Sequence, residues 1–178
     1  MKEFLGTSTT VLVVEDDPFY LEMLKSQLSM HFAKILIAKN GLEALDILKT
    51  QAVEVVVTDY MMPNMDGVEL VKRIKERLPL IPILMLTGNA QEDQKVVNAL
   101  EQGAFDVIFK PYSIELLVNR IRNALLLPLL VQVLWSVMSK EWEPMKLDDF
   151  MRLPYQQQLK TIYAFAALLK TKGLRKKI

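Results

Sequence analysis

The chain has 178 residues, which is long for one small domain and short for two full ones, so we expect one domain with an appendage. Its 22 basic and 21 acidic residues nearly cancel, which excludes a global electrostatic attraction to nucleic acid or membranes. The absence of cysteine excludes a disulfide framework and a thiolate metal site. The first residues lack the pattern of a secretory signal, and we therefore expect a cytoplasmic protein.

Short apolar runs that end in polar residues alternate with helical patterns along most of the chain. Each run is apolar throughout and bounded by turn residues, which is typical of a strand buried on both faces of a parallel sheet. The predicted strands are 11–14, 35–38, 53–57, 81–86 and 105–109. The predicted helices are 18–30, 42–50, 67–77, 92–102 and 114–126.

This (βα)5 alternation predicts an α/β fold with an open, doubly wound parallel sheet and helices on both of its faces. Because crossover connections are short and right-handed, we expect the strand order 2-1-3-4-5. In such a sheet, the functional crevice lies at the carboxyl ends of the strands. Polar residues that follow different strands should therefore meet there.

The character of the chain changes after the fifth predicted helix. Residues 124–138 carry no charge, but this run is shorter than the roughly 18 residues of a membrane span, so we expect a buried or interface helix. Pro128 should kink or restart that helix. A further helix is expected between Pro154 and Gly173, with apolar residues at spacings of three or four along one face. That face packs either within the chain or on another subunit or partner.

Four charged residues follow the predicted strands: Glu15 and Asp16, then Asp59, then Lys110. A carboxylate attacks a phosphoryl group when a cation neutralises the crowd of negative charge, and Asp59 is well placed as the acceptor. Mg²⁺ prefers oxygen ligands, and Asp16 and Asp59 can provide carboxylates for it. Lys110 supplies a mobile positive charge that can pair first with the acceptor and then with a phosphoryl oxygen. The pattern predicts a phosphoryl-transfer site.

Several residues near these motifs have simpler explanations. Asp17 before Pro18 and Asp66 before a predicted helix are assigned to helix capping. Asn40 with the following glycine is assigned to a turn. His31, the single histidine, is assigned to a surface or packing role rather than to phosphotransfer.

Segments that carry this constellation resemble the receiver domain of bacterial two-component response regulators, a chemotaxis-regulator-like, flavodoxin-like fold. The four segments are VLVVEDDP, VVVTDYMMPNMDG, ILMLTG and GAFDVIFKP. They occur in the family's order and at matching spacing. The resemblance covers about residues 8–126, which we assign to a receiver domain, and leaves 127–178 as a helical extension for interaction or dimerisation.

The resemblance implies roles for further residues. It places Mg²⁺ on Asp16 and Asp59, on Glu15 through a water molecule, and on the backbone carbonyl of Met61. Thr87 would donate its hydroxyl to a phosphoryl oxygen.

Gly88, where the family has a small residue, would leave the phosphoryl group accessible. The peptide between Lys110 and Pro111 is expected to be cis. The family's usual aromatic switch residue is replaced here by Val107, which puts that switch in doubt, and a relay through Phe105 and Phe109 is unsupported.

We therefore expect a signalling protein that catalyses only its own phosphotransfer and dephosphorylation, with a sensor histidine kinase or phosphotransfer protein as its donor. The leading hypothesis is output through protein–protein interaction of the receiver and its helical tail. Residues 128–178 hold nine basic and four acidic side chains, so the alternative is a phosphorylation-controlled DNA- or RNA-binding regulator. A phosphate shuttle or sink is a third possibility, and contact with a membrane ranks below protein association.

Overall fold

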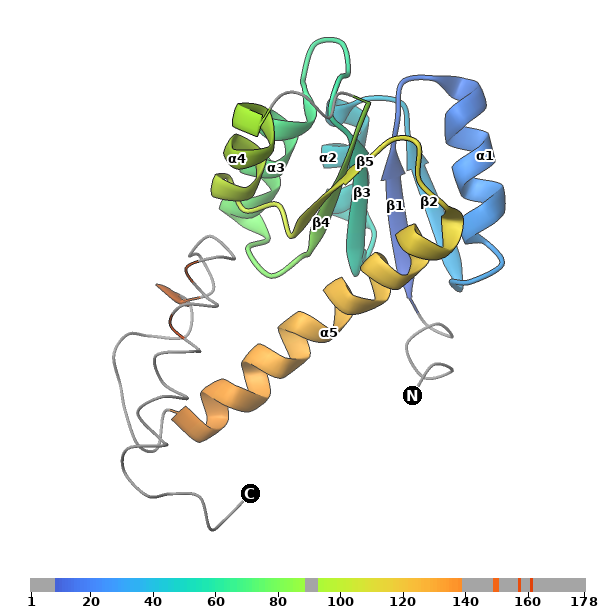
Figure 1. Ribbon diagram of the computed structural model, residues 1–178. Coiled ribbons are helices and arrows are strands. Elements are labelled where there is room, and N and C mark those ends of the chain that lie inside the picture. The colour runs from blue at the N-terminus through green and yellow to red at the C-terminus, as the bar shows by residue number, and fades with distance from the viewer. Residues whose placement is uncertain (1–8, 89–92, 139–148, 151–156, 158–160, 162–178) are drawn as a thin grey trace.

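The computed structural model describes residues 9–88, 93–138, 149–150, 157 and 161. Strands and helices alternate along them (Figure 1). The strands are β1 (Thr10–Val14), β2 (Lys34–Ala38), β3 (Val55–Asp59), β4 (Ile83–Thr87) and β5 (Asp106–Phe109). The helices are α1 (Pro18–Leu28), α2 (Gly41–Thr50), α3 (Gly67–Arg77), α4 (Asp93–Glu101) and α5 (Ile114–Met138).

All the strands are parallel and form one sheet in the order β2-β1-β3-β4-β5. The predicted fold and strand order are therefore confirmed. Every residue of β3 and of β4 is buried, which explains why these strands are apolar throughout rather than alternating. Reversal of the strand order beside β1 opens a crevice at the carboxyl ends of β1 and β3.

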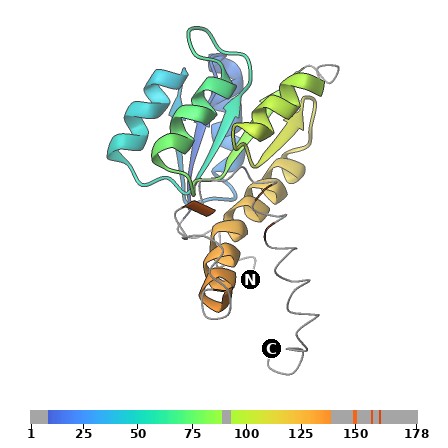
Figure 2. The same cartoon turned by 90° about the vertical axis from the view of Figure 1, so that its left-hand side faces the viewer.

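Helices cover both faces of the sheet, with α1 and α5 on one face and α2, α3 and α4 on the other (Figures 1 and 2). Successive side chains of a strand point to opposite faces. Accordingly, Val11 and Val13 of β1 pack toward α1 and α5, whereas Leu12 and Val14 pack toward α2 and α3. These two apolar clusters fix the sheet between its helices.

The ends of β3 and β4 differ from the prediction. Both strands begin two residues later than expected and end on a polar residue, Asp59 and Thr87. Asp59 pairs with Leu86, and Thr87 pairs with Phe109. The ladder depends on backbone pairing, so a polar side chain does not end it, and both residues are fixed by the sheet itself.

Side-chain caps fix the starts of three helices. The predicted caps are confirmed: Asp17 accepts from two backbone N–H groups of α1, and Asp66 accepts from Glu69 N at 2.8 Å in α3. The prediction that Asn40 forms only a turn is wrong, because its side chain accepts from Glu43 N at 2.9 Å and caps α2. Asn is as good a cap as Asp, since its carbonyl oxygen accepts the same bond.

Of the two alternatives predicted for Pro128, a restart of the helix is wrong, whereas a kink stays a prediction. The helix α5 runs without a break from Ile114 to Met138 and extends past the end of the sheet (Figure 1). A proline removes one backbone N–H and crowds the carbonyl four residues earlier. The helical bonds on either side remain available, and the surrounding leucines and alanine are strong helix formers. The helix thus crosses the proposed boundary between residues 126 and 127.

Most of the predicted tail helix between Pro154 and Gly173 lies outside the described residues. In the part of the chain that the structure describes, no helix combines the length and apolar character needed to cross a membrane.

Candidate functional site at the carboxyl ends of the strands

Three of the predicted charged residues come together at the carboxyl edge of the sheet. Glu15 follows β1, Asp59 ends β3 and Lys110 follows β5. Lys110 Nζ lies 2.6 Å from Asp59 Oδ1 and 3.0 Å from Glu15 Oε2. The two carboxylates are almost completely buried, whereas the Lys110 side chain is 25% exposed. Residues 95 positions apart in sequence thus form one charged cluster.

The electrostatics of this cluster depend on burial and on mutual pairing. Burial raises the pKa of Glu15, the hydrogen bond from Lys110 opposes that change, and the charge of Asp59 adds to it. Burial alone would lower the pKa of Lys110, but hydrogen bonds to Asp59 and Glu15 raise it overall. Lys110 is therefore held as an ammonium ion between two acids.

The backbone around Asp59 fixes the orientation of its carboxylate. Met61 N donates to Asp59 Oδ2 at 2.7 Å, so each carboxylate oxygen has a donor. Gly67, the first residue of α3, lies so close that an added Cβ would overlap the Asp59 carbonyl oxygen. Met61 is 69% exposed, and it contacts the site through this backbone N–H.

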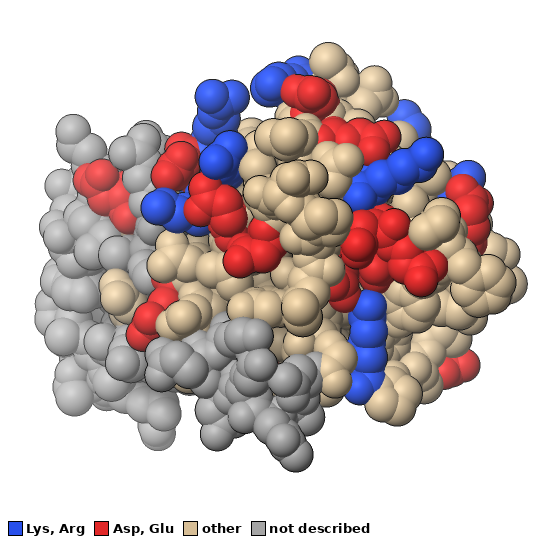
Figure 3. Space-filling model, turned by 90° about the horizontal axis from the view of Figure 1, so that it is seen from above, with Lys and Arg blue, Asp and Glu red and all other residues tan. Residues whose placement is uncertain are grey.

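The site also contains a group of carboxylates suited to a hard cation. One oxygen each from Glu15, Asp16 and Asp59 lies within 4.8 Å of the other two. Asp16 is exposed, whereas the other two are buried, so an ion held here would keep contact with water. Figure 3 views this edge from above and shows acidic side chains gathered on it. Oxygen donors with an open side fit Mg²⁺, which usually retains several waters.

Thr87 and Gly88 lie at the end of β4, beside the charged cluster. Thr87 is buried, and its carbonyl oxygen accepts from Lys110 N at 2.7 Å, which ties the lysine backbone to β4. The peptide between Lys110 and Pro111 is cis, as predicted. Gly88 is exposed, and a Cβ added there would meet no described atom within 4 Å. As far as the described residues show, the end of β4 thus leaves open space on this side of the site.

Phe105 and Val107 do not lie on one face of the sheet, contrary to what a regular strand over both residues predicts. Val107 packs with the cluster under α2, α3 and α4, whereas Phe105 packs with the cluster under α1 and α5. The reason is that Phe105 precedes β5, so the alternation of a regular strand does not apply to it. Phe109 is 40% exposed.

Sequence reasoning missed two tyrosines of this site. Lys110 Nζ lies 4.2 Å from the centroid of the Tyr20 ring. Tyr20 Oη donates to Tyr112 Oη at 2.6 Å, although the residues are 92 positions apart. Tyr20 lies in the first turn of α1, four residues after Asp16, and Tyr112 follows Lys110 by two residues. In the sequence, both tyrosines lie close to the charged motifs, and this closeness could have indicated them. A tyrosine at such a position is, however, equally compatible with a place in the apolar core.

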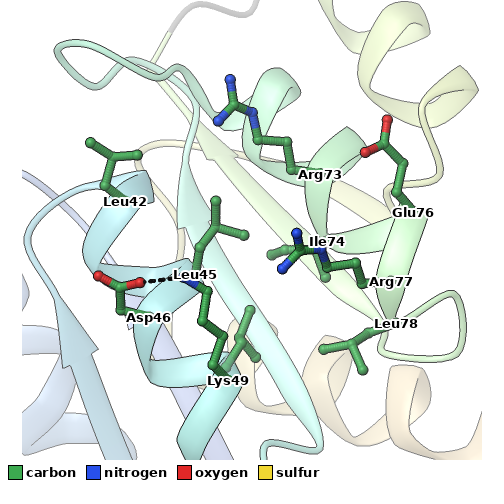
Figure 4. A pocket seen from close by; sticks show the side chains of 10 residues that line it. Leu42, Leu45, Asp46, Lys49, Arg73, Ile74, Glu76, Arg77 and Leu78 are labelled. Atoms are coloured by element: carbon green, nitrogen blue, oxygen red, sulfur yellow. Dashed lines mark hydrogen bonds and ion pairs between the residues drawn. The ribbon is translucent and has the colours of Figure 1, made fainter.

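A groove of about 670 Å³ lies elsewhere, between α2 and α3 (Figure 4). Its lining combines leucines with charged side chains, two of which, Asp46 and Lys49, pair with each other at 2.7 Å. None of the predicted site residues lines it. The predicted site residues thus lie at the strand ends and not in this groove.

Comparison with protein families gives a match over residues 11–122 to the model described as "Response regulator receiver domain". Response regulator MprA from Mycobacterium sp. strain KMS is 36% identical over 115 residues, which are 65% of this chain and 50% of that protein. The probable transcriptional regulatory protein TcrX from Mycobacterium tuberculosis is 36% identical over 126 residues, which are 70% of this chain and 53% of TcrX. The chain thus spans about half the length of these curated relatives.

A solved structure shares the fold. The BeF3-activated receiver domain of DrrB matches with a TM-score of 0.60 and 30% identity, and the match covers 66% of this chain and 97% of that one. The similarity therefore coincides with the segment that contains the sheet and the charged cluster.

Proposed function

The chain belongs to the response regulator receiver-domain family, and we propose that it accepts a phosphoryl group on Asp59 from the phosphohistidine of a sensor kinase or phosphotransfer protein. The observation that carries the proposal is the Asp59 carboxylate, nearly buried, 2.6 Å from the Lys110 ammonium and grouped with two further acids. Such signalling takes place in the cytoplasm, where we expect this protein.

In the proposed reaction, a carboxylate oxygen of Asp59 attacks the phosphorus atom of the donor. The new O–P bond forms as the P–N bond to the donor histidine breaks, and the imidazole nitrogen keeps the electron pair. The product is an acyl phosphate. Met61 N and Lys110 Nζ, which already bind the two oxygens of Asp59, hold the carboxylate in one orientation for the attack.

Lys110 and Thr87 would act on the transferred group. Lys110 stabilises negative charge as it moves from the carboxylate to the phosphoryl oxygens, and its link to the carbonyl of Thr87 keeps it beside the acceptor. The Thr87 hydroxyl donates to a second phosphoryl oxygen. Gly88 leaves room for the incoming donor, consistent with the open space next to it.

Mg²⁺ is the proposed cofactor. Asp16, Asp59 and the backbone carbonyl of Met61 would bind it directly, and Glu15 would bind it through a water molecule. When bound, the ion would neutralise charge on the phosphoryl oxygens as the transfer proceeds. The carboxylate cluster supports this assignment because it holds more acids than the single ammonium of Lys110 can balance.

The output would run through protein–protein contacts of a receiver domain, residues 8–126, and a helical extension, residues 127–178. The unbroken helix α5 crosses that boundary and gives a mechanical connection between the two parts. The molecule would catalyse only its own phosphotransfer and dephosphorylation. A DNA- or RNA-binding output is the second candidate, supported by the basic tail and by the name of the relative TcrX. A phosphate shuttle or sink would need no output from the tail.

Intact-mass spectrometry after treatment with acetyl phosphate and Mg²⁺ tests the acceptor. The wild-type protein should gain one phosphoryl group, and Asp59→Asn should gain none, because an amide is not a nucleophile toward phosphorus. Asp46→Asn is the matched control, since Asp46 is an exposed aspartate on α2 that pairs only with Lys49 among the described residues. An Asp59→Asn protein that is phosphorylated at the wild-type rate would contradict the assignment.

A further inference from the structure

Among the described residues, the Lys110 ammonium contacts two acids and one aromatic ring. Two N–H directions are taken by Asp59 and Glu15. On a third side, the Tyr20 ring lies 4.2 Å from Nζ, within the range of a cation–π contact. The site is partly closed to water, which strengthens such a contact relative to an exposed one. Tyr20 is therefore a direct neighbour of the site's one described cation.

The Tyr20 ring is held in place at both ends. Its backbone N–H donates to the capping carboxylate of Asp17 at 2.9 Å, which fixes the start of α1. Its hydroxyl donates to Tyr112 in the loop after β5 at 2.6 Å, and both rings are partly buried against the cluster under α1 and α5. The first turn of α1 is thereby bound to the loop that carries Lys110.

We propose that Tyr20 is a positioning residue for Lys110 in the phosphoryl transfer, and that Tyr112 orients the Tyr20 ring through the bond between their hydroxyls. This inference rests on the proposed function of Asp59. In addition to that function, it assigns to Tyr20 the task of keeping Lys110 in the crevice while Asp59 is converted to an acyl phosphate.

The physical reason lies in what phosphorylation alters. When Asp59 becomes an acyl phosphate, one carboxylate oxygen is esterified and the negative charge moves to the phosphoryl oxygens, so Lys110 must exchange one acceptor for another. The Tyr20 ring takes no part in that chemistry and attracts the ammonium equally before and after it. The ring restricts the long Lys110 side chain in advance. Less rotamer entropy is therefore lost when the ammonium exchanges one acceptor for another.

Tyr112 also keeps its proton. Burial raises the pKa of the Tyr112 phenol, and the negative charges of Glu15 and Asp59 raise it further. Tyr112 therefore does not compete with Asp59 for the lysine as a phenolate.

The rate of phosphorylation by acetyl phosphate, measured by intact-mass spectrometry, tests the inference. Because this donor is a small molecule, binding of a kinase does not contribute to the rate. Tyr20→Leu and Tyr20→Met should each be slower by about tenfold, because the aromatic face is lost. Tyr20→Phe keeps the face and should stay within about threefold of wild type. Phe19→Leu is the matched control on the same turn, since Phe19 is 81% exposed, and should retain the wild-type rate.

The two hydroxyls provide a second test. Tyr20→Phe and Tyr112→Phe remove the same hydrogen bond, so the double variant should be no slower than either single variant. Additive losses would show that the hydroxyls act separately and would overturn the role of Tyr112.

A spectroscopic measurement separates positioning from a general loss of structure. In the unphosphorylated wild-type protein, the ε-methylene protons of Lys110 should show an upfield ring-current shift in carbon–proton NMR. The shift should persist in Tyr20→Phe and disappear in Tyr20→Leu. A wild-type protein without the shift would overturn the inference.

The two proposals can fail separately. A wild-type protein that is phosphorylated on Asp59 while Tyr20→Leu reacts equally fast would overturn the positioning role alone. A wild-type protein that takes up no phosphoryl group would contradict the proposed function itself.

Discussion

Lys110 and Lys75 lie at opposite ends of the sheet, and each is partly buried in surroundings of a different kind. Lys110, at the carboxyl ends of the strands, pairs with Asp59 and Glu15, and these partners raise its pKa. Lys75, near the C-terminus of α3, donates to the carbonyl oxygens of Pro79 at 3.0 Å and Ile81 at 2.7 Å. Burial lowers the pKa of Lys75 to about 8, and no carboxylate of the described residues pairs with it.

The contrast shows that partner chemistry decides what a buried lysine does. Carbonyl oxygens satisfy the donors of Lys75 but do not balance its charge, so its ammonium serves to link the end of α3 to the loop before β4 at an energetic cost. The carboxylates around Lys110 favour its charged form, and in the proposed function that charge would be available to a phosphoryl group. Lys75 thus supports the scaffold, whereas Lys110 belongs to the proposed site.

The largest expected effect is on the rate of phosphorylation. Lys110→Met should slow phosphorylation by acetyl phosphate by about 10²–10³-fold, because the charge that stabilises the phosphoryl oxygens is lost. Lys75→Met should leave the rate at the wild-type value, since Lys75 lies at the other end of the sheet. Intact-mass kinetics on both variants would measure the difference. Equal rates for the two would remove the functional distinction between the lysines.

The positions of Glu15, Asp59 and Lys110 could be predicted from the sequence because of the parallel topology. Short apolar runs alternating with helices leave few ways to arrange the chain, and each predicted residue follows a strand at the same edge of the sheet. Strand order and sheet type thus determine the approximate site before any side chain is placed. The helical caps of Asp17 and Asp66 depend on neighbouring residues alone, which is why they too were predicted correctly.

The contacts of Lys75, Tyr20 and Tyr112 could not be predicted in this way. The two tyrosines meet across 92 positions through the exact packing of α1 against the loop after β5, and neither periodicity nor strand order reports that packing. The helical path of the chain through Pro128 is likewise a balance between one lost hydrogen bond and many retained ones. Local propensity weighs only the first of these.

A smaller effect should appear in the free energy of unfolding as the pH rises. The unfolded chain keeps the Lys75 proton up to its ordinary pKa of 10.5, whereas the folded protein releases it near pH 8. The unfolded state therefore binds more protons in that window, and stability rises with pH there. Between pH 7 and 10, this contribution amounts to about 2 kcal/mol in favour of the folded state.

Urea unfolding of the wild type and of Lys75→Met at pH 7 and pH 10 would isolate this contribution. From pH 7 to pH 10, the free energy of unfolding of the wild type should rise by about 2 kcal/mol relative to that of Lys75→Met. Lys110 and Tyr112 act in the opposite direction near and above pH 10, because their pKa values are raised, but both are present in both proteins and cancel. A difference that does not change with pH would show that Lys75 stays charged in the folded protein.

The smallest expected effect is the stabilisation by Mg²⁺, which should act at one end of the sheet only. At tenfold the dissociation constant, a ligand that binds only the folded state adds about 1.4 kcal/mol to the free energy of unfolding. Asp16→Asn should lose most of this gain because it removes the exposed member of the carboxylate group, whereas Lys75→Met should keep it in full. Thermal melts with Mg²⁺ and with EDTA would measure the change. Since Asp16 belongs to no described ion pair, its substitution tests the cation site without disturbing the pairing of Lys110, and an unchanged Mg²⁺ response would place the ion elsewhere.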